Sequence, residues 1–485
     1  MKKLISTFIA IITTLSCLAG TYNIRNFGAK GDGKAIDSPA FNKAIEAAAK
    51  SGGGTVLVPA GNYLCYSVRL KSHITLQFES GARMIAAPTT EKLGYDEPEE
   101  NKFDEYQDFG HSHWKNSLIW GIGLEDVTIC GRGFIDGSNL SNGFGLGVKG
   151  GERKIALDYN IGKGYANKAI SLKECKNVVI SDITMYRCGH FCLLATGVDY
   201  LTLRDVTVDS NRDGFDIDCC YGVHVSNCTV NTPFDDGIVL KATYALGYYK
   251  DTEHVTITNC NVSGFEVGTL LDQTRREPQN GVSHKDVTRR SSGRVKLGTE
   301  SSGGFKNIAV SNCAFDCCGG LLVETTDGGD CEDITFNNIT MRNCSDAPIF
   351  VMIGNRLRSP EGRGIGHVRR VRFSNINAWN SNPRFNVIIT GYKDNKIEDI
   401  SLRDIYLHTK GGLTPADAEY QVVPETESRY PDPKLFGTMP TRGMFLRHID
   451  GIRIDGMHFS FAEKDTRQLI MEDDVKHAVL NNVTE

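Results

Sequence analysis

The chain has 485 residues, of which 40% are hydrophobic and 23% charged, and its formal net charge is −5. This balance excludes an intrinsically disordered chain, and no run of lysine or arginine points to nucleic acid as a partner. Beyond the first twenty residues no apolar run is long enough to cross a bilayer, so we expect no membrane span.

The N-terminus has the pattern of a secretory signal peptide. Two lysines precede an apolar run from Leu4 to Ile12, and small residues follow up to Gly20. The run is too short to span a membrane, although a buried N-terminal helix would give a similar pattern. We therefore expect residues 1–20 to be removed and residues 21–485 to form one exported domain, periplasmic or extracellular.

The chain contains 15 cysteines, and an exported protein can form disulfides. However, many of these cysteines recur at one place of a repeated phrase, which indicates a buried ladder of small residues. The adjacent pairs Cys219-Cys220 and Cys317-Cys318 would bridge only with strain, and no spacing suggests a zinc site. We expect mostly free, buried thiols. Lipid modification at Cys17 remains an alternative, although Thr14-Leu15-Ser16 is a poor approach to such a site.

One helix is predicted near the N-terminus. Asp37 supplies a cap, Pro39 fits the first turn, and Gly52–Gly54 ends the helix. Its apolar stripe consists of Phe41, Ala44, Ile45 and Ala48. A strand with the sequence TVLVP follows, and we expect the helix to cover an open strand edge at this end of the fold.

Most of the chain repeats one phrase, seen in VVISDITM, LTLRDVTV, VHVSNCTV, VTITNCNV, IAVSNCAF, ITFNNITM, VRFSNINA and ISLRDIYL. Its Asp or Asn falls at Asp182, Asp205, Asn227, Asn259, Asn312, Asn338, Asn375 and Asp404. The base spacing is 22 to 23 residues, with longer gaps at insertions. Alternating apolar and polar residues predict short strands, and the Asx residue marks a bend at which its side chain can bond the backbone.

A strand-rich period of this size without intervening helices predicts an all-β, single-stranded parallel β-helix. A β-sandwich would need hairpin signals, and a leucine-rich repeat would need its own consensus; neither is present. Residues 413–442 turn polar and proline-rich, which predicts a long loop. The phrase returns as GIRIDGMHFS at residues 451–460, so we expect the same solenoid to continue to near the C-terminus.

Five aspartates interrupt the strand pattern between Ser210 and Gly237. Asp213 and Asp236 are 23 residues apart, which is one coil, so they should lie one above the other. Asp235 reaches the same place only if the chain bends at Phe234–Gly237. Asp216 and Asp218 are more simply explained as turn residues.

Carboxylates that converge repel one another, and this repulsion separates their pKa values. Such a group suits the cleavage of a glycosidic bond, in which one carboxyl protonates the leaving oxygen and another activates water or attacks the sugar. Turn capping and calcium binding are the simpler alternatives for these residues.

These residues resemble glycoside hydrolase family 28, the polygalacturonase and rhamnogalacturonase group of secreted pectin hydrolases. The likeness rests on Asn211-Arg212-Asp213 followed one coil later by Asp235-Asp236, and on YNIRNFGAKGDG, GGGTVLVPAGNY, NSLIWG and GRGFIDG. It implies a right-handed parallel β-helix that hydrolyses a pectic polysaccharide with inversion and without a cofactor or metal. By this resemblance Asp235 is the general acid, while Asp213 and Asp236 position and deprotonate the water.

Two family signatures are absent. Gly293 and Arg294 stand where polygalacturonases carry His-Gly, and Leu322-Val323-Glu324 replaces Arg-Ile-Lys. Glutamate in place of lysine is hostile to a uronate at that position, so the resemblance shifts toward rhamnogalacturonan or toward galacturonosides at chain ends.

Asn211, Lys241, Arg294, Lys296 and Glu300 are the candidates for substrate binding. Lys241, Arg294 and Lys296 have a simpler explanation as surface residues, and Glu300 has one as the end of a turn. His190 is more simply a packing residue than a catalyst.

Two insertions, Tyr244–Thr252 and Leu271–Ser291, would favour action on chain ends if they wall off one end of the site. We expect a monomer. Alternatives to a hydrolase are a polysaccharide lyase, which would need a basic residue and usually calcium, and a non-catalytic carbohydrate-binding β-helix.

Overall fold

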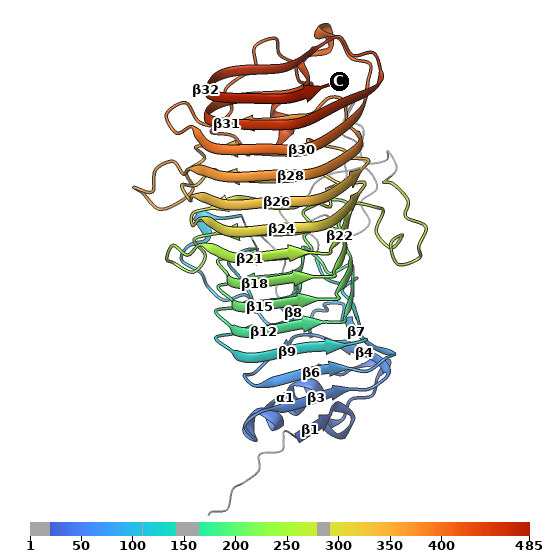
Figure 1. Cartoon of the computed structure of the whole chain (residues 1–485). Coiled ribbons are helices and arrows are strands. Elements are labelled where there is room, and N and C mark those ends of the chain that lie inside the picture. The colour runs from blue at the N-terminus through green and yellow to red at the C-terminus, as the bar shows by residue number, and fades with distance from the viewer. Residues whose placement is uncertain (1–19, 109, 142–163, 279–291) are drawn as a thin grey trace, which may run out of the picture.

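The computed structural model describes residues 20–108, 110–141, 164–278 and 292–485. Residues 1–19 of the predicted signal peptide, with Cys17, and residues 279–291 of the second predicted insertion lie outside the described residues. Within the described ranges the chain winds into stacked coils whose strands pair in parallel (Figure 1). Parallel connections of this kind are right-handed. The predicted parallel β-helix is confirmed.

Each coil contributes strands to three stacks. Stack 1 contains β1 (Gly20–Asn23), β3 (Gly54–Val58), β6 (Ile74–Phe78), β9 (Glu125–Gly131), β12 (Lys176–Ser181), β15 (Asp199–Arg204), β18 (Tyr221–Ser226) and β21 (Thr252–Thr258). Stack 2 contains β2 (Asp32–Ile36), β4 (Gly61–Cys65), β7 (Ala82–Ala86), β10 (Phe134–Asp136), β13 (Thr184–Tyr186), β16 (Thr207–Asp209), β19 (Thr229–Asn231) and β22 (Asn261–Ser263).

Stack 3 carries three of the predicted site residues, Lys241, Lys296 and Glu300. It contains β5 (Val68–Arg69), β8 (Ser117–Ile122), β11 (Lys168–Lys173), β14 (Phe191–Thr196), β17 (Phe215–Asp218), β20 (Ile238–Ala242), β23 (Val295–Ser301), β25 (Leu321–Thr325), β27 (Ile349–Ile353) and β29 (Val387–Thr390). In the C-terminal coils, single bent strands run through more than one stack: β24 (Phe305–Asp316), β26 (Cys331–Arg342), β28 (Val368–Ser381), β30 (Ile397–Gly411), β31 (Thr441–Glu463) and β32 (Gln468–Thr484).

Helical structure is sparse. Besides α1 (Ser38–Lys50) there are four short 3₁₀ turns, η1 (Ile24–Phe27), η2 (Asp104–Tyr106), η3 (Pro415–Asp417) and η4 (Pro433–Phe436), within the described ranges. None of these helices is long and apolar enough to span a bilayer. The predicted loop at residues 413–442 is confirmed between β30 and β31.

Helix α1 covers the N-terminal end of the coils, as predicted (Figure 1). Its apolar stripe is buried against β1, β3 and β5, and the ring of Phe41 meets Tyr63 edge-on at 5.6 Å between centroids. Asp37 stands at the N-cap, but the prediction that it caps the helix with its side chain is wrong. The buried carboxylate instead accepts hydrogen bonds from the backbone N–H groups of Lys30 (2.7 Å) and Gly31 (3.1 Å), because those amides face it from the preceding turn.

The predicted bends lie where the repeated phrase places them. All eight Asx residues adopt left-handed backbone angles, with φ between 52° and 64°. Asn tolerates this conformation better than other residues with a side chain. At Asn312, Asn338 and Asn375 the side chains bond one another along the stack instead of the backbone, at 2.7 and 3.1 Å. The parallel register puts equivalent amides side by side, so each becomes the other's nearest partner.

The inward side chains of all three stacks form one continuous apolar core from Ile24 to Phe459. The 14 cysteines of the described residues are free, and all but Cys130 are buried. This agrees with the predicted ladder of buried thiols: Cys228, Cys260 and Cys313 occupy equivalent places on successive coils.

Candidate active site

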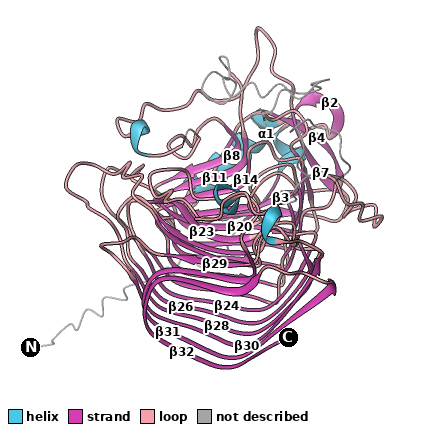
Figure 2. Ribbon diagram, turned by 90° about the horizontal axis from the view of Figure 1, so that it is seen from above, coloured by secondary structure: helices cyan, strands magenta, loops and turns pink. Residues whose placement is uncertain are grey.

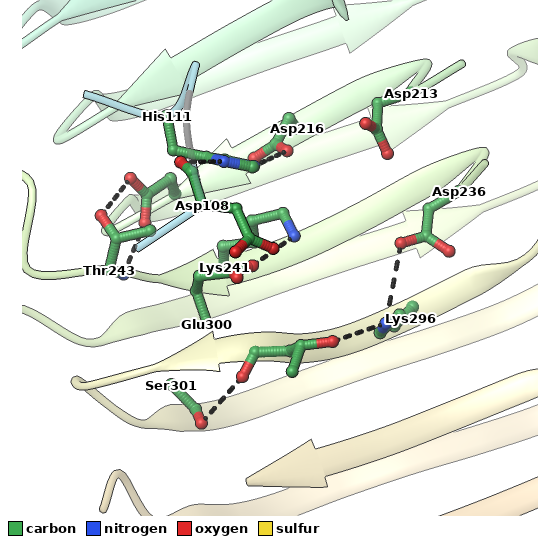
Figure 3. Close-up of polar contacts among 12 residues, drawn as sticks. Asp108, His111, Asp213, Asp216, Asp236, Lys241, Thr243, Lys296, Glu300 and Ser301 are labelled. Atoms are coloured by element: carbon green, nitrogen blue, oxygen red, sulfur yellow. Dashed lines mark hydrogen bonds and ion pairs between the residues drawn. The ribbon is translucent and has the colours of Figure 1, made fainter. Parts of the chain in front are cut away.

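The aspartates predicted to stack lie at the start of neighbouring strands of stack 3. The backbone N–H of Gly214 donates to the carbonyl of Asp236 (3.0 Å), and that of Phe215 donates to Gly237 (3.0 Å). Asp213 and Asp236 therefore stand in register, one coil apart, at the strand spacing of about 4.8 Å. Figure 3 shows the two carboxyl groups above one another on adjacent coils, as the spacing predicts.

Asp235 joins them because the chain bends before β20. The hydroxyl of Thr232 donates to the Asp235 carbonyl (3.1 Å), and the same carbonyl accepts the backbone N–H of Gly293 (3.0 Å). A carboxylate oxygen of Asp235, one of Asp213 and a ring nitrogen of His190 lie within 4.8 Å of one another. The bend that the adjacent pair requires is present, and three carboxylates converge.

Their surroundings shift the pKa values of Asp213 and Asp235 in opposite directions. Burial, followed by repulsion from Asp235 and Asp236, raises the pKa of Asp213 well above its ordinary value. Burial also raises the pKa of Asp235, but the guanidinium of Arg212 outweighs it together with His190 and Arg294, so the pKa of Asp235 falls below its usual range. Arg212 donates to Asp235 Oδ2 through Nε (3.1 Å) and Nη2 (2.9 Å).

Two of the predicted substrate-binding cations neutralise protein carboxylates. The Nε of Arg294 donates to Asp236 Oδ1. The Nζ of Lys296 lies 3.9 Å from Asp236 Oδ2 and 3.3 Å from Glu324 Oε2, and donates to the hydroxyl of Thr299 at 2.8 Å. Glu324, the residue that replaces lysine in the missing signature, is fully buried and paired, so its charge does not face outward.

Lys241 and Glu300, the other predicted binding pair, bond each other. Lys241 Nζ donates to Glu300 Oε2 at 2.7 Å, as Figure 3 shows. Arg358 Nη2 donates to the second oxygen of Glu300 at 2.6 Å, and Arg356 lies 3.8 Å from it. Burial opposes ionisation of Glu300, but Lys241 and the two arginines hold its pKa well below the ordinary value.

Asn211 and His190 flank the three aspartates. Asn211 is half-buried, and its carbonyl accepts the backbone N–H of Phe234 at 3.2 Å. His190 stacks on Phe191 with 4.0 Å between ring centroids, as expected for a packing residue. Its Nε2 also lies 3.5 Å from Asp213 Oδ2, so it touches the carboxylate cluster as well.

The sequence reasoning missed several residues that reach the site from irregular segments. His111 Nε2 contacts Asp216 Oδ2 at 3.1 Å (Figure 3). Arg358, which bonds Glu300, also donates to Asp108 at 2.5 Å. Burial lowers the pKa of His111, but the carboxylates of Asp216 and Glu300 together raise it by more. Asp216 is fully buried on β17, so it is a member of the site and not a turn residue. The segments that carry Asp108, His111 and Arg358 contain no copy of the repeated phrase, so the repeat could not place them.

Two further segments border the site along stack 3. On the N-terminal side Trp114 packs on Phe191 and Leu194, which point outward from β14. On the C-terminal side the loop before β31 covers the outward face of β25, β27 and β29. The apolar residues of this second contact are Leu322, Phe350, Met352, Ile388, Val423, Phe436 and Met439. Figure 2 shows loops gathered over the side of the coil that carries stack 3.

The first predicted insertion, Tyr244–Thr252, forms part of the contact on the N-terminal side of the site. In the first insertion, Tyr244 packs edge-on against Phe103 (5.4 Å) and Tyr106 (5.3 Å), which belong to the segment before β8. In the second, the described part begins beside stack 2, since the N–H of Leu271 donates to Oδ2 of Asp209, on β16, at 3.2 Å.

The cluster of His190, Asp213 and Asp235 offers donor atoms for a metal ion. Arg212 already places a cation on the Asp235 carboxylate, which disfavours a second positive charge there. The chemistry of the site therefore rests on its carboxylates and cations.

The fold and sequence both match known proteins. A family model described as rhamnogalacturonase A/epimerase, pectate lyase-like, matches residues 21–239. A probable polygalacturonase of Vitis vinifera is 25% identical over 361 residues, covering 71% of this chain and 65% of its own length. An exo-poly-α-D-galacturonosidase of Dickeya chrysanthemi is 24% identical over 381 residues, covering 71% and 58%. The chain thus spans less than two thirds of the length of these two curated relatives.

Among solved structures, a family 28 exopolygalacturonase of Yersinia enterocolitica superimposes with a TM-score of 0.68, at 17% identity, over 95% of this chain and 78% of that one. Fold and family model together define a pectate-lyase-like parallel β-helix protein. More narrowly, the chain is similar in sequence to polygalacturonases and galacturonosidases, and its fold is that of a glycoside hydrolase family 28 enzyme.

Proposed function

We propose that the protein is an exported glycoside hydrolase that releases sugars from the ends of galacturonate-containing pectic chains. The observation that carries this proposal is the convergence of Asp213, Asp235 and Asp236 on stack 3, between two bordering segments. Asp235 would protonate the leaving oxygen, while Asp213 and Asp236 would hold and deprotonate water on the opposite face of the sugar, so that the anomeric configuration inverts. Neither step needs a cofactor.

Action at chain ends is supported by the two borders. A polysaccharide that is cut internally must continue past the cleavage point in both directions. Trp114 lies on one side of β17, β20 and β23, and the loop with Val423 and Phe436 lies on the other. Substrates to compare are polygalacturonate and rhamnogalacturonan, because Leu322-Val323-Glu324 replaces the Arg-Ile-Lys signature of polygalacturonases.

The test incubates the purified protein and its Asp235→Asn variant with polygalacturonate, rhamnogalacturonan and their oligosaccharides in the presence of a chelator. We expect new reducing ends from the unaltered protein alone, with mono- or disaccharide products and little loss of viscosity. Proton NMR of the first product should show the inverted anomer. Large early products would refute action at chain ends.

The same reactions separate the alternatives. Products that absorb in the ultraviolet and vanish with chelator would mean a lyase, and retention of glycan without cleavage would mean a binding module. Export is tested separately, by N-terminal sequencing of the protein recovered outside the cytoplasm, which should begin near residue 21.

A further inference from the structure

Arg212 and Asp235 form the outward-facing ion pair of the carboxylate cluster. Two guanidinium nitrogens of Arg212 share one oxygen of Asp235, at 3.1 and 2.9 Å. The side chains of this pair are 17% and 24% exposed, whereas Asp213 and Asp236 are 6% and 4% exposed. Anything that approaches the cluster from solvent meets this pair first.

The pairing conflicts with the role proposed for Asp235. A general acid must carry a proton before it reacts, and a guanidinium on its carboxylate favours the ionised form. His190 and Arg294 face the same carboxylate and lower its pKa in the same direction as Arg212, while burial opposes them. In the free protein the balance leaves Asp235 ionised, so something must change when substrate binds.

The other cations near the cluster are less available. Arg294 and Lys296 pair with Asp236 and Glu324, and their side chains are only 10% and 0% exposed. Lys241 is 7% exposed and pairs with Glu300. Arg358 is 26% exposed but already bonds two carboxylates, those of Asp108 and Glu300.

We propose that Arg212 is the residue that binds the carboxylate of a uronic acid at the scissile bond, and that it leaves Asp235 to do so. The inference rests on the proposed function and deepens it. A uronate carboxylate offers the guanidinium the same planar, charge-assisted partner that Asp235 offers. The exchange lets Asp235 take a proton from solvent, which it then gives to the glycosidic oxygen as the bond to the anomeric carbon breaks. The attacking water gives its own proton to Asp213 or Asp236.

The test compares free galacturonate oligosaccharides with their methyl esters, which have the same shape without the charge. We expect the unaltered protein to prefer the free acid in kcat/KM by roughly 10- to 100-fold, the range of one charged hydrogen-bonded contact. Arg212→Gln should bring this preference to within about 3-fold, and Arg212→Lys should restore part of it. In Arg212→Gln the pH limit set by Asp235 should move upward, because the acid loses the cation that ionises it.

Arg370→Gln is the matched control. Arg370 makes the same kind of forked contact with Asp333, at 2.7 and 3.1 Å, on stack 1 away from the site. It should change neither the preference nor the pH profile. If Arg212→Gln slows both substrates equally and leaves the pH profile unchanged, Arg212 has a structural role and the inference is wrong.

Calorimetric binding of the same oligosaccharides separates this inference from the proposed function. Turnover without any dependence of acid preference on Arg212 would leave the hydrolase in place and overturn the inference. If the protein binds the free acid more tightly through Arg212 but does not cleave it, the inference about Arg212 holds and the proposed hydrolase is wrong.

Discussion

Asp213 carries a conflict between stability and function that can be measured. Its folded-state pKa is raised well above the ordinary value, first by burial and then by Asp235 and Asp236. A carboxyl of this kind contributes stability below its unfolded pKa of about 3.9, and that contribution is lost as the pH rises through the folded value.

Asp213→Asn should therefore raise the melting temperature at pH 7 while abolishing hydrolysis. The gain should shrink as the pH falls toward about 4, where both forms are uncharged at this position. Thermal unfolding across pH 4 to 8 measures it. A variant that melts below the unaltered protein at pH 7 would show that the contact with His190 outweighs the repulsion.

Glu300 should behave in the opposite way. Its pKa is held well below the ordinary value, so its contribution to stability is present above about pH 4.3 and is lost as the pH falls through the folded value. Glu300→Gln removes the carboxylate that pairs with the buried Lys241, which should cost about 3–5 kcal/mol of unfolding free energy at pH 7.

A surface pair provides the comparison. Glu46 lies 3.2 Å from Lys71 with both side chains about half exposed, and Glu46→Gln should change the unfolding free energy by less than about 1 kcal/mol. Equal losses from the two glutamates would contradict the buried network.

For individual residues, the sequence predicts the position of those that lie on the repeated strands. Asp213 and Asp236 could be placed because their spacing equals one coil, and Lys241, Lys296 and Glu300 fall on strands of the same stack. His111 could not be placed, since it comes from an irregular segment 105 residues before its partner Asp216. The prediction that the asparagine amides bond the backbone is wrong for a related reason. Local turn chemistry does not reveal that the next coil places an equivalent amide within reach.

The ladder of asparagines is the element whose conformation can be tested most directly. Asn338 has a φ of 55°, and its amide bonds both Asn312 and Asn375. Alanine would keep the strained backbone angle without these bonds, whereas glycine adopts that angle freely. Asn338→Ala should thus lose about 1 kcal/mol more stability than Asn338→Gly, although both lose the same amide contacts. Urea unfolding of the two variants measures the difference, and equal losses would refute the part played by the bend.

Elements that follow the period were predictable, and those outside it were not. The stripe of α1 and the strand phrases depend on local spacing, so they appear where expected. The merging of short strands into bent ones from β24 onward depends on whether pairing continues through the Asx bend, which local sequence does not reveal.

At the scale of the whole molecule, the walls around stack 3 come from segments without any repeat. For the long loop before β31 the sequence predicts only a loop and not its packing on stack 3, because the apolar residues of the loop follow no regular spacing. Val423, Phe436 and Met439 find their partners on strands that come much earlier in the chain, from Leu322 to Ile388. The fold class thus follows from sequence, while the shape of the site needs the tertiary structure.

The distribution of thiols is also a property of the whole coil, and it predicts how the cysteines react. Of the 14 free cysteines among the described residues, 13 are buried. Burial raises the pKa of the Cys331 thiol well above its ordinary value, and contacts with Cys228 together with burial raise that of Cys260 to about 12. Because the thiolate is the reactive form, these groups should resist both labelling and oxidation while the protein is folded.

Dithiothreitol should therefore leave the melting temperature unchanged, and a thiol reagent should react slowly with the native protein, first at the half-buried Cys130. Unfolding in urea should expose all 14 at once, which makes the burst of labelling a direct reading of the intact core. Cys130→Ser supplies the control, because it should remove this first reaction of the native protein and nothing else. A melting temperature that falls with reductant would mean that the stacked thiols of neighbouring coils had paired, and would replace the ladder of free cysteines with cross-links between coils.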